Sequence, residues 1–315
     1  MSTGLLSRIA ETLFWIGRYV ERADDTARIL DVHLHRMLEE PSADVDAGCR
    51  ALLAILGVPP GDDARIDIGT VLARLAYDDA TPSSITGALQ AARTGGRSVR
   101  EVISTEMWEC LNVAWHELEG RRRAAERLGP HAFLRYVRER AALFSGLADA
   151  TMSRDEGWHF LVLGRSLERI DMTARLLSLR MPSASYAPDW SMLLRASGAD
   201  ESYIRTHGGT GEPRLVASFL MLDRLFPRSV LHALTLAEDC LAVLDPDPAR
   251  AGFTDAARRP IGQLRTRLEY TDTALLLEQL PELLTALQNT CVRATEAVAD
   301  KYFQYALPVA WEQEG

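Results

Sequence analysis

Apolar residues recur every three or four positions along most of this chain, a spacing typical of helices that bury one face. In the first segment Ile9, Leu13, Ile16 and Val20 keep this spacing, and the segment 160–181 repeats the same register. Alternating β-branched runs closed by Asn-Gly or Asp-Gly turns, which would indicate strands, do not occur. The pattern therefore predicts an all-α protein, a multi-helix bundle with no β-sheet.

Clusters of proline and glycine interrupt the pattern and set the expected helix ends. Among them are the Gly95-Gly96 pair and the loop from Gly208 to Gly211. That loop has neither the preceding strand nor the Lys-Ser/Thr of a phosphate-binding P-loop, so we interpret it as a connection. The expected helices span about 6–39, 45–57, 65–78, 83–93, 97–128, 131–150, 154–181, 188–196, 213–224, 227–244, 249–268 and 273–306.

One helical phrase is written twice, 147 residues apart. The copies begin at Gly17 and Gly164, and nine of the fourteen aligned residues are identical. Glycine inside a helix costs about 1 kcal/mol relative to alanine, so a glycine in both copies indicates a close helix–helix approach or room for a ligand. We expect these two long helices to pack together as a quasi-equivalent pair. The repeated polar residues are Arg18, Glu21, Arg22, Thr26 and Arg28 in the first copy and Arg165, Glu168, Arg169, Thr173 and Arg175 in the second.

The repeat also bears on domain organisation. Its offset would suit two duplicated halves of about 1–150 and 151–315, but the match does not continue convincingly outside the two helices. We therefore expect one composite helical domain over residues 1–315.

The repeated polar side chains have three interpretations. If both helices pack centrally, each guanidinium needs a carboxylate partner, and the residues would form a buried ion-pair network that joins the helices. Alternatively, arginine forks and carboxylates line a polar cleft for an anionic ligand such as a carboxylate, a phosphate or a peptide end. A solvated charged face is the third interpretation, and it would leave the duplicated identities without a cause.

Other candidate sites have less support. Glu156 and His159 show the ExxH spacing of di-iron bundles, but such a centre needs a second motif and two further carboxylates, so we expect no metal site and no cofactor. Asp31 and His35, one turn apart, are expected to form a surface pair. The four cysteines form no CxxC and are expected to be reduced and mostly buried. No serine or cysteine occupies a recognised nucleophile elbow, so no complete catalytic constellation is visible.

Charge and hydropathy exclude further classes. The chain has 35 basic and 44 acidic residues, a net charge of −9, and no basic run longer than residues 121–123, so we expect no nucleic-acid partner. The N-terminal residues do not resemble a secretory signal, and no stretch approaches eighteen consecutive apolar residues. We expect a cytoplasmic protein without membrane contact, and the pattern sets no oligomeric state.

The doubled phrase also resembles a known family. Gly17-Arg18-Tyr19-Val20-Glu21-Arg22 and its echo Gly164-Arg165-Ser166-Leu167-Glu168-Arg169 are similar to the ER motif of the bacterial alpha-E family. The resemblance covers nearly the whole chain, with further matching segments at 14–16, 23, 26–28, 97–100, 104–109, 163, 189–190, 193–195, 226–230 and 268–272.

The resemblance implies an all-helical protein encoded beside, or fused to, circularly permuted ATP-grasp amide ligases, with a role in peptide synthesis or modification. It supplies no catalytic residues. The missing nucleophile, metal set and phosphate loop favour a non-enzymatic scaffold or partner subunit, with an ATP-grasp-type ligase or its peptide substrate as partner. The alternative is an enzyme, or half of one, whose arginine–glutamate cleft binds a carboxylate or phosphate and takes part in amide-bond chemistry.

Overall fold

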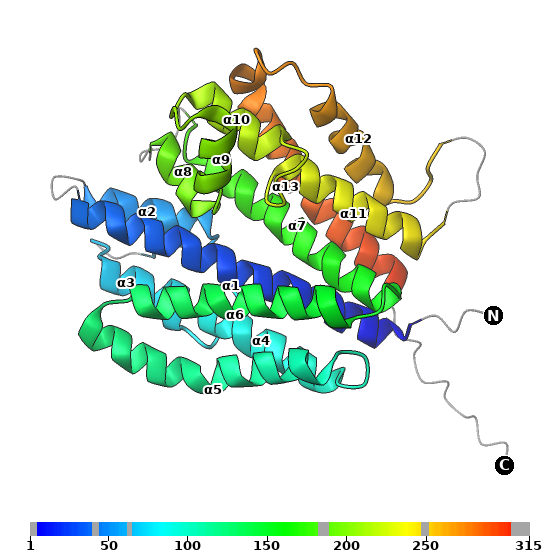
Figure 1. Cartoon of the computed structure of the whole chain (residues 1–315), viewed down its shortest axis with the longest axis horizontal. Helices are drawn as coiled ribbons and strands as arrows, with labels where there is room; N and C mark the ends of the chain where they lie inside the picture. Colours follow the sequence, from blue (N-terminus) through cyan, green and yellow to red (C-terminus); the bar gives the residue numbers. More distant parts are fainter. Residues whose placement is uncertain (1–4, 40–43, 62–64, 182–188, 247–251, 304–315) are drawn as a thin grey trace.

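The computed structural model describes residues 5–39, 44–61, 65–181, 189–246 and 252–303, and these contain helices and no strand (Figure 1). The expected all-α class is confirmed. In chain order the elements are α1 (Ser7–Glu39), α2 (Val45–Ile55), α3 (Ile68–Leu72), the π-helix η1 (Ala73–Tyr77), α4 (Ile85–Ser98), α5 (Thr105–Leu128), α6 (His131–Thr151), α7 (Glu156–Ser178), α8 (Trp190–Ala196), α9 (Asp200–His207), α10 (Pro213–Leu222), α11 (Val230–Leu244), α12 (Arg258–Glu269) and α13 (Leu276–Tyr302).

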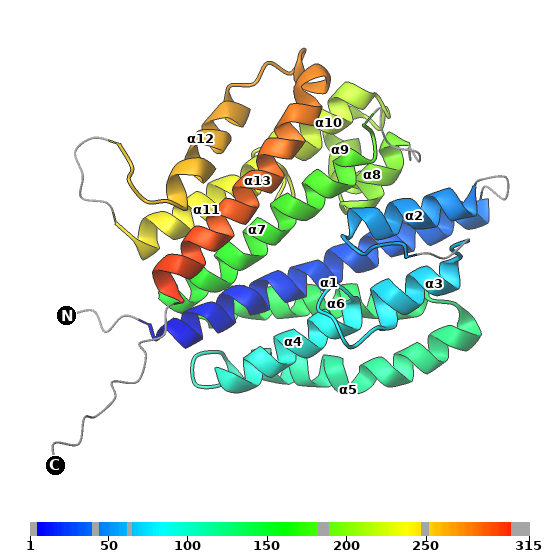
Figure 2. The same cartoon turned by 180° about the vertical axis from the view of Figure 1, so that it is seen from behind.

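Helices α1 and α7, which carry the two copies of the repeated phrase, pack against each other in the centre of the fold (Figures 1 and 2). Helix α7 is buried on every face over most of its length, as expected for a helix surrounded by others. Its first turn is fixed by Asp155, whose carboxylate accepts a hydrogen bond from the Trp158 amide. The central position places the repeated polar residues inside protein on both helices.

The other helices cover this pair from two sides in a similar way. Helix α1 packs on α4 and α6, with α5 between them on the outside, whereas α7 packs on α11 and α13, with α12 outside (Figures 1 and 2). Each repeat helix therefore carries its own group of partners, and the interface between α1 and α7 joins the two groups.

A second repeated feature, which the helical pattern did not reveal, lies just before α4 and α11. In both places a serine caps the helix, and its hydroxyl accepts a hydrogen bond from the amide three residues later. The same hydroxyl donates to the carbonyl of an aspartate six residues earlier. The shared residues are Asp78, Pro82 and Ser84 in the first copy and Asp223, Pro227 and Ser229 in the second.

The expected break at Gly95-Gly96 is wrong, because α4 continues to Ser98 and α5 begins only at Thr105. A Cβ on Gly95 would press on Ile16 at 3.1 Å, and one on Gly96 would press on Leu111 at 2.8 Å. These glycines permit α4 to lie close to its neighbours and do not end the helix.

Helix α9 was not expected. Only Tyr203 of its eight residues is buried, so the segment has no apolar period that a sequence pattern could reveal. Asp200 and Glu201 in its first turn complement the helix dipole, and Gly208 ends it in the left-handed region at φ 70°. The predicted ends at residues 188, 249–251 and 304–306 lie outside the described residues.

Candidate functional site

The two repeat helices touch backbone to backbone at their shared glycines. A Cβ on Gly17 would overlap the Leu161 carbonyl oxygen, and a Cβ on Gly164 would overlap the Phe14 carbonyl oxygen, each closer than the 3.0 Å that real Cβ atoms keep. Only glycine permits this approach. The prediction that Gly17 and Gly164 lie together as a quasi-equivalent pair is confirmed.

Reciprocal ion pairs flank this contact. Arg169 on α7 donates from Nε and Nη2 to the carboxylate of Glu21 on α1 at 2.7 and 2.8 Å. Arg22 on α1 donates in the same way to Glu168 on α7 at 2.5 and 3.0 Å. Both glutamate side chains are almost fully buried, 4% and 1% exposed. Each helix therefore holds the other through a two-point arginine–carboxylate contact.

The remaining pair of repeated arginines differs between the copies. Arg18 donates from Nε to Glu168 at 2.7 Å and from Nη1 to Thr295 at 3.0 Å. Arg165 lies 3.8 Å from Asp149, and its Nε is buried without a hydrogen-bond partner among the described residues. Burial lowers the pKa of Arg165. The twofold relation between the copies is approximate at this point.

Arg28 and Arg175 pair with aspartates of their own helices and do not themselves bridge α1 and α7. Arg28 Nε lies 3.0 Å from Asp24, and Arg175 Nε lies 2.7 Å from Asp171, both at the i,i+4 spacing that a helix brings together. Arg175 also donates to the Ile55 carbonyl at 3.1 Å and so ties the end of α2 to α7.

The repeated threonines Thr26 and Thr173 are both buried. The Thr26 hydroxyl is fully enclosed and has no hydrogen-bond partner among the described residues. Burying a hydroxyl without a partner is costly, so the described protein atoms leave the hydrogen-bonding capacity of this hydroxyl unsatisfied.

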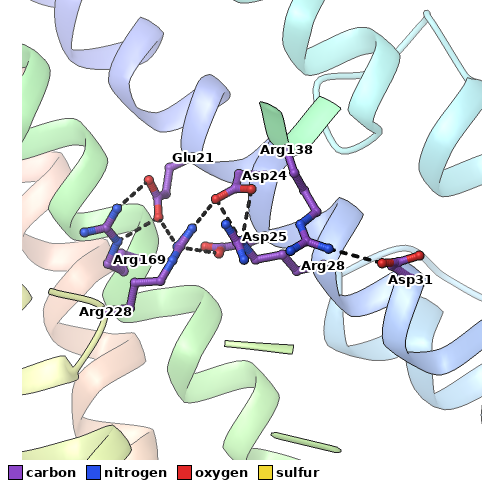
Figure 3. A network of polar contacts seen from close by, with 8 residues as sticks. All are labelled: Glu21, Asp24, Asp25, Arg28, Asp31, Arg138, Arg169 and Arg228. Carbon is purple, nitrogen blue, oxygen red and sulfur yellow. Dashed lines mark hydrogen bonds and ion pairs between the residues drawn. The ribbon is translucent and has the colours of Figure 1, made fainter. Parts of the chain in front are cut away.

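Arg228, in the loop before α11, is the member of the network that the helical phrase did not predict (Figure 3). It donates from Nη1 to Glu21 at 2.7 Å and to Asp25 at 3.0 Å, and from Nη2 to Asp24. These three carboxylates lie within 4.8 Å of one another, a spacing that could hold a cation. The Arg228 guanidinium already contacts all three, so the residues present fit an ion-pair cluster better than a metal site.

The cluster sets opposite pKa shifts on its acids. Burial would raise the pKa of Glu21, but Arg169 and Arg228 outweigh it and lower this pKa to about 2. For Asp25, burial dominates and raises the pKa to about 8, because Arg228 offsets only part of it and two other carboxylates lie close by. The cluster therefore holds one carboxyl that is protonated near neutral pH.

Replacing Asp25 with asparagine is expected to remove a pH-dependent loss of stability. Because the folded-state pKa of Asp25 lies near 8, above the 3.8 of the free side chain, its contribution is present below pH 3.8 and is lost as the pH rises to 8. An asparagine side chain cannot ionise, so Asp25→Asn should gain stability over wild type by up to about 1.4 kcal/mol per pH unit in this window. Urea unfolding of both proteins between pH 5 and 8 measures the difference. A difference that stays constant with pH would contradict the assignment.

A hollow of about 210 Å³ lies beside the network, between α1, α7, the end of α2 and the loop before α4. At the corresponding place in the other copy, next to Thr173 and Arg228, only about 10 Å³ remains. The larger hollow is lined by the charged residues Arg22, Glu168, Asp171 and Arg175 and by Thr26, Ser83, Leu56, Gly57 and Met172.

The other sequence candidates do not converge on a site. Glu156 accepts a hydrogen bond from the Leu5 amide at 2.7 Å, whereas His159 bonds to the Asp155 carbonyl through Nδ1, also at 2.7 Å. The four free cysteines are buried, and burial raises the pKa of each thiol, which disfavours the nucleophilic thiolate.

Asp31 and His35 come together as expected, 3.8 Å apart, and two side chains of α6 join them. His131 Nδ1 lies 2.7 Å from Asp31, and Arg138 donates to the second Asp31 oxygen at 3.1 Å (Figure 3). Because the Arg138 guanidinium binds the Asp31 carboxylate, this cluster, like the one around Arg228, already contains a positively charged partner.

Comparison with known proteins finds a family match over nearly the whole chain. The model of the Alpha-E family, described as a predicted alpha-helical domain with a conserved ER motif, matches residues 5–303. Uncharacterised proteins of Mycobacterium bovis and Mycobacterium tuberculosis are 25% identical to this chain over an alignment of 314 residues. The alignment covers 89% of this chain. The chain spans 35% of the length of these relatives. No solved structure matches the chain. Among the described helices, none has the length and apolar character needed to cross a membrane. With a family match that runs from the start of α1 through the end of α13, the chain belongs to the Alpha-E family.

Proposed function

We propose that this Alpha-E domain is a non-enzymatic helical scaffold or partner subunit that assists an ATP-grasp-type amide ligase in peptide synthesis or modification. The observation that carries the proposal is that the charged residues of the ER motif pair with one another between α1 and α7. The glutamates of the motif are bound by arginines of the opposite helix and are almost fully buried. Buried carboxylates and guanidiniums that neutralise one another can hold two helices together. They are poorly placed to transfer protons or to attack a substrate.

The length of the mycobacterial relatives supports the same proposal. The region similar to this chain makes up 35% of each relative, so there the domain is one part of a longer protein. A domain that lies beside other segments in one chain is suited to act through contact with a neighbour. The choice of an ATP-grasp-type amide ligase as that neighbour follows from the family resemblance of the two ER phrases.

Association with a ligase is the test of this proposal. The purified chain alone is expected neither to hydrolyse ATP nor to form amide bonds, whereas a cognate ATP-grasp-type ligase should co-purify with it through an interface of at least about 1,000 Å². ATP turnover and peptide product are measured for each protein and for the mixture. Amide-bond formation by this chain alone would reject the scaffold role, and the absence of association at micromolar concentrations would reject the partnership.

A further inference from the structure

The two copies of the polar site can be compared residue by residue because both repeated features align them. Thr26 corresponds to Thr173 in the helical phrase, and the capping serines before α4 and α11 form the same hydrogen bonds. The residues just before these serines, Ser83 and Arg228, therefore occupy equivalent places. Ser83 lines the 210 Å³ hollow, and Arg228 lines the 10 Å³ remnant in the other copy.

The two copies differ at two of the positions that line these spaces. In the second copy Arg228 and Asp25 fill the space and contact each other at 3.0 Å. In the first copy both members of this pair are missing, because Ser83 stands for the arginine and Met172 stands for the aspartate. The hollow therefore lacks the positive charge that Arg228 supplies in the other copy.

The charged side chains that line the hollow offer partners for a positively charged group and for a negatively charged group of a ligand. Asp171 has one guanidinium partner, Arg175, whereas its counterpart Asp24 has two, Arg28 and Arg228. Asp171 therefore lacks the second cation that completes the other copy. Burial, the largest influence on this group, raises the pKa of Asp171, as expected for an acid with one cation too few.

A negatively charged group of a ligand would also find partners in the lining. Arg22 and Arg175 present guanidiniums whose side chains are 24% and 33% exposed, so they can be reached from solvent. Guanidiniums are donors that carboxylates commonly take in proteins.

We propose that the hollow binds a small zwitterion, a free α-amino acid, whose ammonium group takes the place of the Arg228 guanidinium beside Asp171 and whose carboxylate accepts hydrogen bonds from Arg22 and Arg175. A purely anionic ligand would meet two carboxylates in the lining without a positive charge of its own, and a purely cationic one would meet two guanidiniums. A zwitterion adds no net charge and supplies a cation for Asp171 and an acceptor for Arg22 and Arg175. The proposal does not rest on the scaffold function, since the purified chain is tested without a ligase.

Binding is tested by titrating each of the twenty common L-amino acids into the purified chain in a calorimeter. At least one is expected to bind. Its N-acetyl derivative, which keeps only the carboxylate, and its amide, which keeps only the ammonium group, should each bind at least about tenfold more weakly, the equivalent of about 1.4 kcal/mol. No binding at millimolar concentrations, or equal binding of either derivative, would overturn the proposal.

A variant that refills the hollow localises the binding. Ser83→Arg restores the arginine of the other copy and is expected to weaken amino-acid binding at least about tenfold. Ser153→Arg adds the same charge at an exposed loop position and should bind like wild type. If circular dichroism shows that Ser83→Arg is unfolded, Ser83→Gln fills part of the space without charge and should weaken binding in the same direction. Unchanged binding by a folded filling variant would place the ligand elsewhere and overturn the proposal.

Discussion

Replacing Arg228 with alanine is expected to lower the free energy of unfolding by about 3–5 kcal/mol, the effect of removing one partner from a buried ion pair. The guanidinium contacts Glu21, Asp24 and Asp25, and its side chain is only 14% exposed. Without it the three carboxylates would lie close together with fewer cations. Urea unfolding at pH 7, followed by circular dichroism, measures the loss.

A neighbouring arginine serves as the control. Arg224 lies in the same loop and pairs with Glu269 at 3.1 Å, but its side chain is 66% exposed. Arg224→Ala should cost no more than about 1 kcal/mol, as is usual for surface ion pairs. Equal losses from the two alanine variants would show that the cluster around Arg228 behaves like a solvated surface.

Replacing Gly164 with alanine is the second change with a large expected effect. The added Cβ would overlap the Phe14 carbonyl oxygen, and backbone atoms cannot turn away as a flexible side chain can. Helices α1 and α7 would have to separate, which also lengthens the ion pairs on both sides of the contact. We expect a loss of about 3 kcal/mol, the upper end of the usual cost of overpacking.

Gly146 provides a control with the opposite sign. It lies inside α6, is exposed, and has no atom within 4 Å of a built Cβ. Gly146→Ala should therefore stabilise the protein by about 0.5–1 kcal/mol through helix propensity alone. If Gly164→Ala were as stable as wild type in the same thermal and urea melts, the close approach of α1 and α7 would be wrong.

The helical pattern predicted the class of the fold well because burial of one face leaves a clear period in long helices such as α1 and α7. It failed where burial leaves no period. Helix α9 buries only Tyr203, and Gly95 and Gly96 act through the neighbours they admit rather than through their own conformation. Such contacts are fixed by tertiary packing, which a single segment of sequence does not record.

At the candidate site, a buried ion-pair network between the two helices was one of three interpretations of the repeat, and the pairs Glu21–Arg169 and Glu168–Arg22 agree with it. The repeat did not predict Arg228, whose role depends on a loop about 200 residues away in the chain. A signal for it was present in the aspartate, proline and serine shared by residues 78–84 and 223–229. That spacing belongs to a turn and a helix cap, so a search for helical period passes over it.

The most direct test of the central claim, that the doubled ER phrase is a buried ion-pair clamp between α1 and α7, is a double-mutant cycle on Glu21 and Arg169. Urea unfolding is measured for wild type, Glu21→Gln, Arg169→Met and the double variant. The contact of 2.7 Å inside the protein predicts a coupling energy of at least about 1 kcal/mol, within the range of about 0.5–3 kcal/mol found for residues in one network. Additive effects, with a coupling below about 0.5 kcal/mol, would contradict the clamp.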